Sequence, residues 1–124
     1  MINKPNGDGI LRVIKATDCS RKGMIAAWQN EAAFRQEAML ALVMLPGSFW
    51  LAQSLGHWAL LVSVLLLVMI VELLNSAIEA LTDRVSLERH ELSGRAKDMG
   101  SAAVTFSLTI VALVWGTALY DKLV

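Results

Sequence analysis

Residues 58–81 form an apolar run of 24 residues that is long enough to cross a lipid bilayer, and Glu72 lies inside it. A carboxylate at this depth costs about 2.5–3.5 kcal/mol on membrane-insertion scales, so membrane proteins retain one mainly where it has a function. The run predicts a transmembrane helix. Its carboxylate is the first candidate for chemistry.

Hydrophobic residues dominate the rest of the chain as well. They make up 56% of the 124 residues, and the mean hydropathy is +0.54. Two further runs of 19 residues, 38–56 and 102–120, contain no charge. The three blocks predict an all-α membrane protein with three transmembrane helices. The first 37 residues lack the apolar core of a cleavable signal peptide, so we expect the N-terminus to be retained.

The segment before the first span has the pattern of an amphipathic helix. Apolar residues recur at helical spacing from Ile10 to Ala32, and arginines flank the apolar arc. We expect this helix to lie on the membrane surface; a helix packed on a soluble core is the alternative. The chain then divides into a surface region, 1–37, and a transmembrane region, 38–124, within one domain.

Pro46 and Gly47 fall in the middle of the first predicted span. Proline removes a backbone donor and glycine loosens the next turn, so we expect a kinked helix here. A re-entrant hairpin is the alternative.

Basic residues are distributed unevenly about the predicted spans. Ten of them lie before the first span or between the second and third, whereas the other side has only Lys122. The positive-inside rule places the N-terminus and residues 84–98 in the cytoplasm and the C-terminus outside. The formal net charge is zero, and we expect no nucleic-acid partner. The ten residues are Lys4, Arg12, Lys15, Arg21, Lys22, Arg35, Arg84, Arg89, Arg95 and Lys97.

Polar residues form one stripe on the second predicted span. Glu72, Asn75, Glu79 and Asp83 fall within an arc of about 80° on an ideal helix, so the stripe must face protein or water. Glu72 and Glu79 are about 10 Å apart along the axis, which makes them separate groups rather than a pair that shares a proton. The stripe runs toward the cytoplasmic surface. There, Arg95, Lys97 and Asp98 begin the third span, and Glu31 and Glu37 end the surface helix.

Two kinds of chemistry fit this stripe. In the first, Glu79 and another carboxylate such as Glu31 hold Mg²⁺ together with nucleotide phosphates, Lys97 neutralises phosphate charge, and Glu72 takes a proton from a hydroxyl. In the second, the acids form a proton or ion pathway, although uncharged first and third spans argue against a path across the bilayer. A purely structural role in helix association is the third reading. The soluble-kinase signatures are absent from the sequence.

Three motifs in order make the sequence resemble the prokaryotic diacylglycerol kinase family. They are NEAAFRQE at residues 30–37, VELLNSAIEA at 71–80 and HELSGRAKDMGSAA at 90–103. The resemblance covers nearly the whole chain from Arg12 to Tyr120. It implies a homotrimer of three-span protomers, each with an N-terminal surface helix. It also implies transfer of the γ-phosphate of Mg-ATP to a lipid hydroxyl.

The resemblance also implies roles for individual residues. Glu72 corresponds to the general base, and Glu31 and Glu79 correspond to the Mg²⁺ ligands. Cys19 departs from the family pattern, which has an aromatic residue there, and a lone His90 in a polar segment is more often a solvated side chain. The implied nucleotide-binding residues are Arg12, Cys19, Glu31, Asn75, Glu79, Glu88, Arg89, His90, Lys97 and Asp98. The implied lipid-binding residues are Arg12, Trp28, Ala33, Glu37, Glu72 and Ser101.

These observations lead to one principal hypothesis, a kinase that converts diacylglycerol to phosphatidate with ATP at the cytoplasmic membrane interface. An undecaprenol kinase is the alternative within the same class, and a proton or ion transporter subunit is the alternative from another class. Three helices of one chain cannot enclose a four-residue polar stripe, so we expect active sites assembled between subunits.

Overall fold

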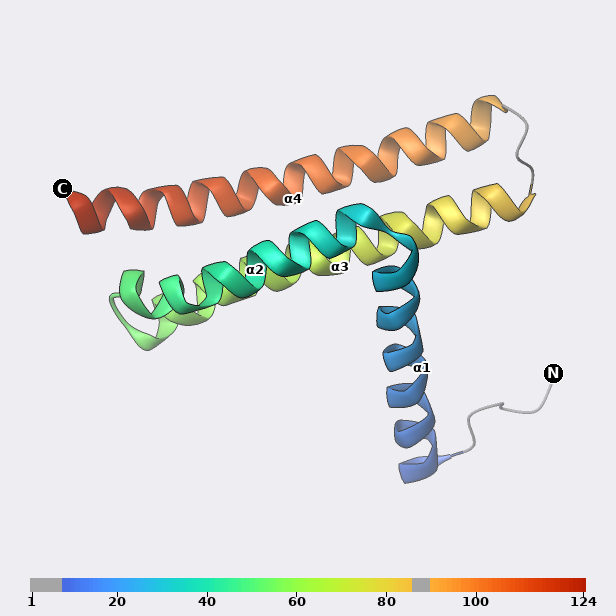
Figure 1. The fold of residues 1–124 in the computed structure, drawn as a ribbon, viewed down its shortest axis with the longest axis horizontal. Helices are drawn as coiled ribbons and strands as arrows, with labels where there is room; N and C mark the ends of the chain where they lie inside the picture. Colours follow the sequence, from blue (N-terminus) through green and yellow to red (C-terminus); the bar gives the residue numbers. More distant parts are fainter. Residues whose placement is uncertain (1–7, 86–89) are drawn as a thin grey trace.

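The computed structural model describes residues 8–85 and 90–124, and these residues form four α-helices and no strand. The helices are α1 (Gly9–Asn30), α2 (Ala32–Leu51), α3 (Leu55–Val85) and α4 (Glu91–Leu123). In Figure 1, α2, α3 and α4 run along the long axis of the molecule, and α1 projects from them at a steep angle. The expectation of an all-α protein is confirmed.

Helices α3 and α4 contain the second and third predicted spans. They have 31 and 33 residues, or about 46 and 50 Å, which exceeds the roughly 30 Å of a bilayer core. Only 33% and 17% of their most apolar stretches are buried within the chain. A core helix of a soluble protein would be mostly buried, so these two helices indicate a membrane protein.

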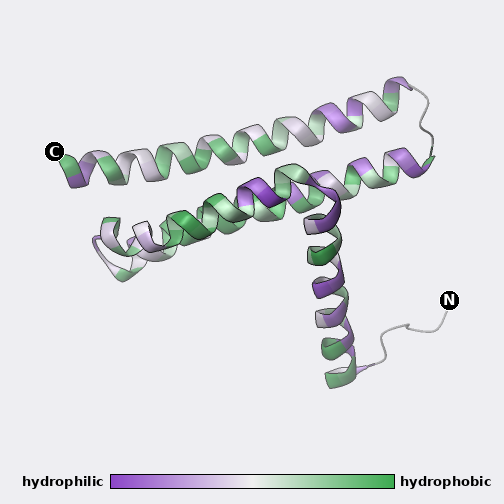
Figure 2. Ribbon diagram, viewed as in Figure 1, coloured by the Kyte–Doolittle hydropathy of each residue, from purple (hydrophilic) through white to green (hydrophobic). Residues whose placement is uncertain are grey.

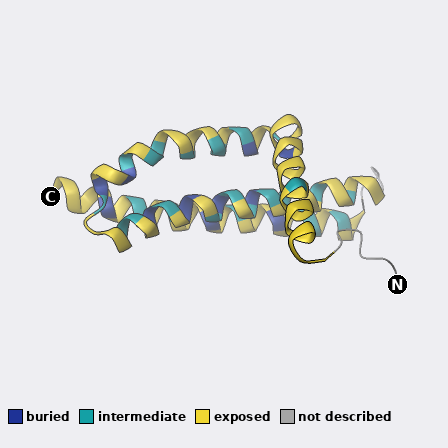
Figure 3. Cartoon of the chain, turned by 90° about the horizontal axis from the view of Figure 1, so that it is seen from below, coloured by how far each residue is buried: buried dark blue, intermediate teal, exposed yellow. Residues whose placement is uncertain are grey.

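Helix α2 differs from the predicted first span, 38–56. It begins earlier and ends at Leu51, and by length and composition it is not among the membrane-span candidates of the described residues. The reason is that Arg35, Gln36 and Glu37 form part of its first two turns, which leaves about 21 Å of uncharged helix. The helix continues through Pro46, so the re-entrant hairpin is wrong, and Figure 3 shows α2 bending in its last turns.

The boundary between surface helix and first span also differs from the expectation. Helix α1 ends at Asn30, and Glu31 is extended, with φ −120° and ψ 106°. Glu37 therefore does not end the surface helix but lies in the second turn of α2. Asn30 Nδ2 donates to the carbonyl of Ala26 at 2.8 Å, and Arg35 Nη1 donates to the carbonyl of Trp28 at 2.7 Å. These bonds satisfy carbonyls in the last turn of α1 and stabilise the break.

The best-packed end of the bundle lies away from α1. Leu51, Leu61 and Ala118 form its buried core, and Trp115 packs against them. The indole Nε1 of Trp115 donates to the carbonyl of Leu61 at 3.0 Å, which joins α4 to α3. Figure 2 shows hydrophilic residues gathered at the other end of the bundle, where α3 ends and α4 begins. The polar stripe therefore lies toward the end of the bundle where α1 joins it.

Candidate active site

Glu72 is buried in the middle of α3, with only 4% of its surface exposed. Its Oε2 atom has no hydrogen-bond partner among the described residues, and the same is true of Glu37 Oε2, Asn75 Oδ1 and Ser76 Oγ. A buried polar group without a partner costs about 1–3 kcal/mol. Four such atoms in one region mark a place where a ligand or another chain is expected to supply the missing partners.

Glu37 of α2 lies beside Glu72 of α3. Burial, followed by a hydrogen bond with Glu72 and charge repulsion from it, together raise the pKa of Glu37 from 4.5 to about 7. At neutral pH the Glu37 carboxyl therefore holds a proton for part of the time. Sequence reasoning separated Glu72 from Glu79 correctly by distance along the helix but missed this partner, because Glu37 belongs to another helix.

Asn75 and Glu79 are joined one turn apart on α3. The Asn75 side-chain amide donates from Nδ2 to Glu79 Oε1 at 3.3 Å, and both side chains are partly buried. A carboxylate held by an amide donor at a partly buried site keeps a defined orientation. Its remaining lone pairs are available to a cation or a ligand.

Lys97 and Asp98 are adjacent in the sequence but have different surroundings. Lys97 Nζ forms an ion pair of 2.6 Å with Asp83 Oδ1 of α3, the last residue of the polar stripe. Asp98 instead lines a shallow hollow of about 400 Å³ with His90 and Arg95. The structure thus brings Asp98 and His90 together, while Lys97 is engaged on the α3 side.

His90 is the N-cap of α4. Its Nδ1 accepts a hydrogen bond from the backbone N–H of Leu92 at 3.0 Å, so the ring is neutral at that nitrogen and carries its proton on Nε2. The exposed ring is solvated, as the sequence suggested. In this tautomer the Nε2–H is a donor that can bind an anion.

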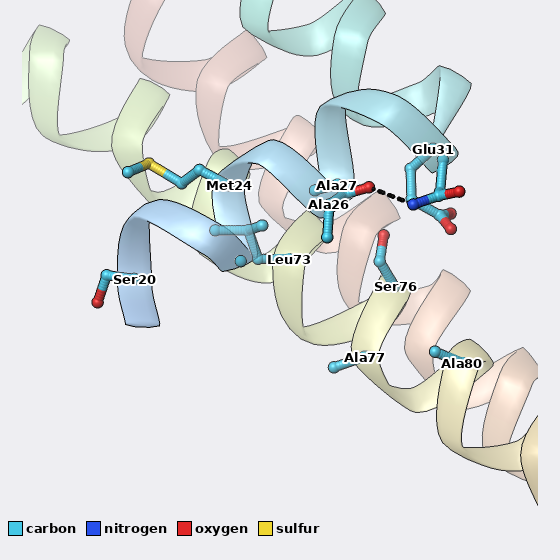
Figure 4. A pocket seen from close by; sticks show the side chains of 11 residues that line it. Ser20, Met24, Ala26, Ala27, Glu31, Leu73, Ser76, Ala77 and Ala80 are labelled. Carbon is cyan, nitrogen blue, oxygen red and sulfur yellow. Dashed lines mark hydrogen bonds between the residues drawn. The ribbon is translucent and has the colours of Figure 1, made fainter. Parts of the chain in front are cut away.

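A groove of about 600 Å³ lies between α1 and α3. Its walls are mainly apolar and include Met24, Ala27 and Leu73, whereas Glu31 and Ser76 lie at one end. Figure 4 shows the Ser76 hydroxyl turned toward the junction of α1 and α2, where Glu31 lies. The Glu31 carboxylate makes no capping bond to α2, which leaves it available for a ligand.

Within one chain, Glu31 and Glu79 lie on different sides of α3. The groove residues of α3 are Leu73, Ser76, Ala77 and Ala80, and the centre of that face is roughly 100° from Glu79 on an ideal helix. The part of the chain that the structure describes contains no group of three or more His, Cys, Asp or Glu side chains that could hold a metal ion.

The remaining predicted site residues are spread along the chain. Arg12, Cys19 and Trp28 are exposed on α1, Ala33 is exposed on α2, and Ser101 is exposed on α4. Glu88 and Arg89 lie outside the described residues. The axis of α1 places Arg12 about 28 Å from Glu31, so Arg12 cannot reach the groove end of its own chain.

Sequence reasoning missed Ser76 as a site residue. It is 8% exposed, and it lies one turn after Glu72, where a small polar residue in an apolar helix is a usable signal. Sequence reasoning also missed Gly100, which is buried against the polar stripe.

The sequence matches the prokaryotic diacylglycerol kinase family over residues 18–119. A diacylglycerol kinase of Pseudomonas aeruginosa is 54% identical over 111 residues, which cover 90% of each chain. One from Escherichia coli K12 is 51% identical over 94% of this chain and 95% of the relative. The chain belongs to the prokaryotic diacylglycerol kinase family. A more distant member, a diacylglycerol kinase of Helicobacter pylori 26695, is 40% identical over 95% of this chain.

Membership in this kinase family confirms the resemblance that the three motifs carried. The match from residue 18 to 119 includes all three motifs, and with them Glu31, Glu72 and Lys97. A kinase requires a nucleotide co-substrate.

Proposed function

We propose that this protein transfers the γ-phosphate of ATP to the free hydroxyl of diacylglycerol and releases phosphatidate and ADP. The observation that carries the proposal is Glu72, a carboxylate that is 4% exposed and has an unpartnered oxygen on a membrane-length helix. The names of the relatives at 54% and 51% identity support diacylglycerol as the acceptor.

In the proposed transfer reaction, Glu72 is the general base. Its free Oε2 accepts the proton of the lipid hydroxyl as the hydroxyl oxygen attacks the γ-phosphorus, and the bond from that phosphorus to the oxygen bridging it to the β-phosphate breaks. Glu37 is beside Glu72 and can share the transferred proton. The protein supplies mostly position and electrostatics, because phosphoryl transfer needs little covalent help.

Glu31 and Glu79 are the proposed ligands of Mg²⁺. The chemistry of the two carboxylates fits, because Mg²⁺ in kinases is usually held by one or two carboxylates together with substrate phosphates and water, not by a cage of protein groups. Since Glu31 and Glu79 lie on different sides of α3 within one chain, they would hold one ion together only if they came from different protomers. When bound, the ion would neutralise charge on the phosphates. Glu79 is oriented by Asn75 at 3.3 Å, and Glu31 is free of helix capping.

The proposed nucleotide site extends to the cytoplasmic start of α4. His90 and Asp98 share the shallow hollow there, and Lys97 would exchange its ion pair with Asp83 for a phosphate. An exposed ion pair of this kind is weak, so the exchange costs little. The family resemblance assigns supporting nucleotide contacts to Arg12, Cys19, Asn75, Glu88 and Arg89.

The apolar groove between α1 and α3 is the proposed site of the lipid. Its apolar walls suit acyl chains, and its polar end places a headgroup hydroxyl near the part of α3 that carries Glu72. Trp28, Ala33, Glu37 and Ser101 keep their assignment as residues near the lipid.

The proposed assembly is a homotrimer of three-span protomers in a bacterial inner membrane, with the N-terminus cytoplasmic and the C-terminus periplasmic. Helix α2, with 20 residues, is about 30 Å long and can serve as the first of the three spans if Arg35 and Glu37 lie at the membrane interface. Helix α1 carries exposed Ile10, Leu11 and Trp28 and would lie on the membrane surface. Arg12 would then serve a neighbouring protomer.

Transfer of labelled γ-phosphate from Mg-ATP in mixed micelles tests the proposal, with diacylglycerol and undecaprenol offered separately. We expect labelled phosphatidate, and no label in either lipid when ATP is replaced by a non-hydrolysable analogue. Transfer only to undecaprenol would overturn the acceptor and retain the chemistry. Transfer to neither lipid would overturn the proposed function and leave proton flux through the protein as the activity to measure.

A further inference from the structure

Gly100 of α4 is buried against Asn75 of α3. A Cβ atom on Gly100 would overlap Asn75 Oδ1, and it would lie 3.2 Å from Asn75 Cγ and 3.8 Å from Asn75 Cα. The last distance shows that the two helix backbones approach closely here. Three other helical glycines, Gly23, Gly94 and Gly116, would place a Cβ in open space, so among these four the steric demand for glycine is specific to Gly100.

The orientation of Asn75 explains why the space matters. Its Nδ2 donates to Glu79, and a carboxylate only accepts hydrogen bonds, so the amide oxygen must turn the other way. That oxygen is buried and has no conventional donor. The Asn75 oxygen lies where the side chain of any other residue at position 100 would begin. In Gly100 a hydrogen on Cα takes that direction and can make a weak C–H···O contact with the oxygen.

We propose that Gly100 is a positioning residue for the phosphoryl-transfer site. The space it leaves holds Asn75 in the one orientation in which its amide donates to Glu79, and so it orients a ligand of the proposed Mg²⁺ site. This inference rests on the proposed function for its catalytic consequence. The contact between Gly100 and Asn75 stands on geometry alone.

The first test is a cycle of thermal unfolding in detergent micelles without nucleotide or Mg²⁺. Gly100→Ala should lower the melting temperature in the wild-type background, because the methyl group displaces the Asn75 amide. In the Asn75→Ala background the same change should leave it unchanged or raise it, because alanine favours a helix more than glycine does. Equal lowering in both backgrounds, or no lowering in the wild type, would overturn the contact.

Gly116→Ala is the matched control for this cycle. It makes the same chemical change on the same helix, where the added methyl group meets nothing within 4 Å among the described residues beyond its own turn of helix. We expect it not to lower the melting temperature. If Gly100→Ala alone does not fold, recovery of folded protein in the double variant supports the contact, and failure to recover it counts against the contact.

The second test separates a positioning role from a structural one. Gly100→Ala should raise the Mg²⁺ concentration for half-maximal phosphate transfer by roughly 10- to 100-fold, since a displacement of about 1 Å in an active site can have an effect of this size. The KM for lipid should change little, and Asn75→Ala should abolish the sensitivity to Gly100→Ala. An unchanged Mg²⁺ dependence in a destabilised Gly100→Ala protein would overturn the positioning role. Absence of transfer by the wild type would instead overturn the proposed function, and the unfolding cycle would still decide the contact.

Discussion

At the scale of single residues, the candidate site consists of acids whose surroundings differ sharply. Glu72 is 4% exposed and has a free oxygen, whereas Glu79 is bonded to Asn75 and Glu31 lies at a helix junction. We propose different roles for these chemically identical side chains, because burial and hydrogen bonding influence which carboxylate accepts a proton and which holds a cation.

Glu37 should make the stability of the protein depend on pH. Its pKa is raised to about 7 in the folded protein, against 4.5 in the unfolded chain, so folding takes up a proton between these values. The contribution of this carboxyl to stability is fully present below about pH 4.5 and is lost as the pH rises through about 7. The melting temperature should fall over this range, and Glu37→Gln should flatten the fall.

Glu91→Gln is the control for that measurement. Glu91 is exposed and pairs with nearby Arg95 at 3.5 Å, so its removal should leave the slope of melting temperature against pH unchanged. A Glu37→Gln protein that keeps the full wild-type slope would show that Glu37 does not bind the proton.

Helical spacing alone placed Glu72, Asn75 and Glu79 on one face, because positions three and four apart share a side of any helix. It could not reveal the contact of Glu37 with Glu72 or that of Gly100 with Asn75. Both contacts join different helices, and the register between helices depends on packing that a single sequence does not display.

At the scale of elements, the prediction worked best for long, uniformly apolar helices. Helices α3 and α4 contain the second and third predicted spans in full. The first predicted span, 38–56, does not coincide with α2, Ala32–Leu51, because the charges at 35–37 were taken as the end of a surface helix. The extended conformation of Glu31, supported by bonds from Asn30 and Arg35 to carbonyls of α1, decides the true boundary.

Trp115 should stabilise the packing of α4 on α3 without taking part in catalysis. Its indole donates to the carbonyl of Leu61 at 3.0 Å, in the core at the end of the bundle away from α1. Trp115→Phe keeps an aromatic ring and removes the donor, so it should lower the free energy of unfolding by about 1 kcal/mol. Reversible unfolding in detergent measures this loss, and kcat should stay within a factor of two or so.

The matched control is Trp50→Phe. The Trp50 indole is exposed, and Lys122 Nζ lies 5.2 Å from the centre of its ring. Because phenylalanine still offers an aromatic face to the ammonium group, this change should cost less stability than Trp115→Phe. Equal costs at the two tryptophans would contradict a specific role for the bond to Leu61.

At the scale of the whole molecule, one chain leaves its site incomplete. Buried oxygens lack partners, Arg12 lies about 28 Å from Glu31 along α1, and α3 and α4 expose most of their apolar stretches. A single sequence reveals that the polar stripe needs covering, but it does not reveal which surfaces of a second copy cover it. The homotrimer therefore remains a proposal.

Mixing of inactive subunits tests that proposal. Arg12→Ala and Glu72→Gln should each be inactive alone, since the first removes a proposed nucleotide contact and the second the base. If each site combines α1 of one protomer with α3 of another, joint refolding of the two variants should restore part of the activity. Refolding of Glu72→Gln with itself is the control. No recovery in the mixture would contradict shared sites.

The most direct measurement compares turnover and nucleotide binding in Glu72→Gln, with Asp121→Asn as a control that removes an exposed carboxylate near the C-terminus. If Glu72 is the general base, we expect Glu72→Gln to lower kcat by roughly 10²- to 10⁴-fold, the usual contribution of such a base, while the affinity of the variant for Mg-ATP changes little. Asp121→Asn should keep both. A Glu72→Gln enzyme that retains its turnover would contradict the central claim that this buried carboxylate accepts the proton of the lipid hydroxyl.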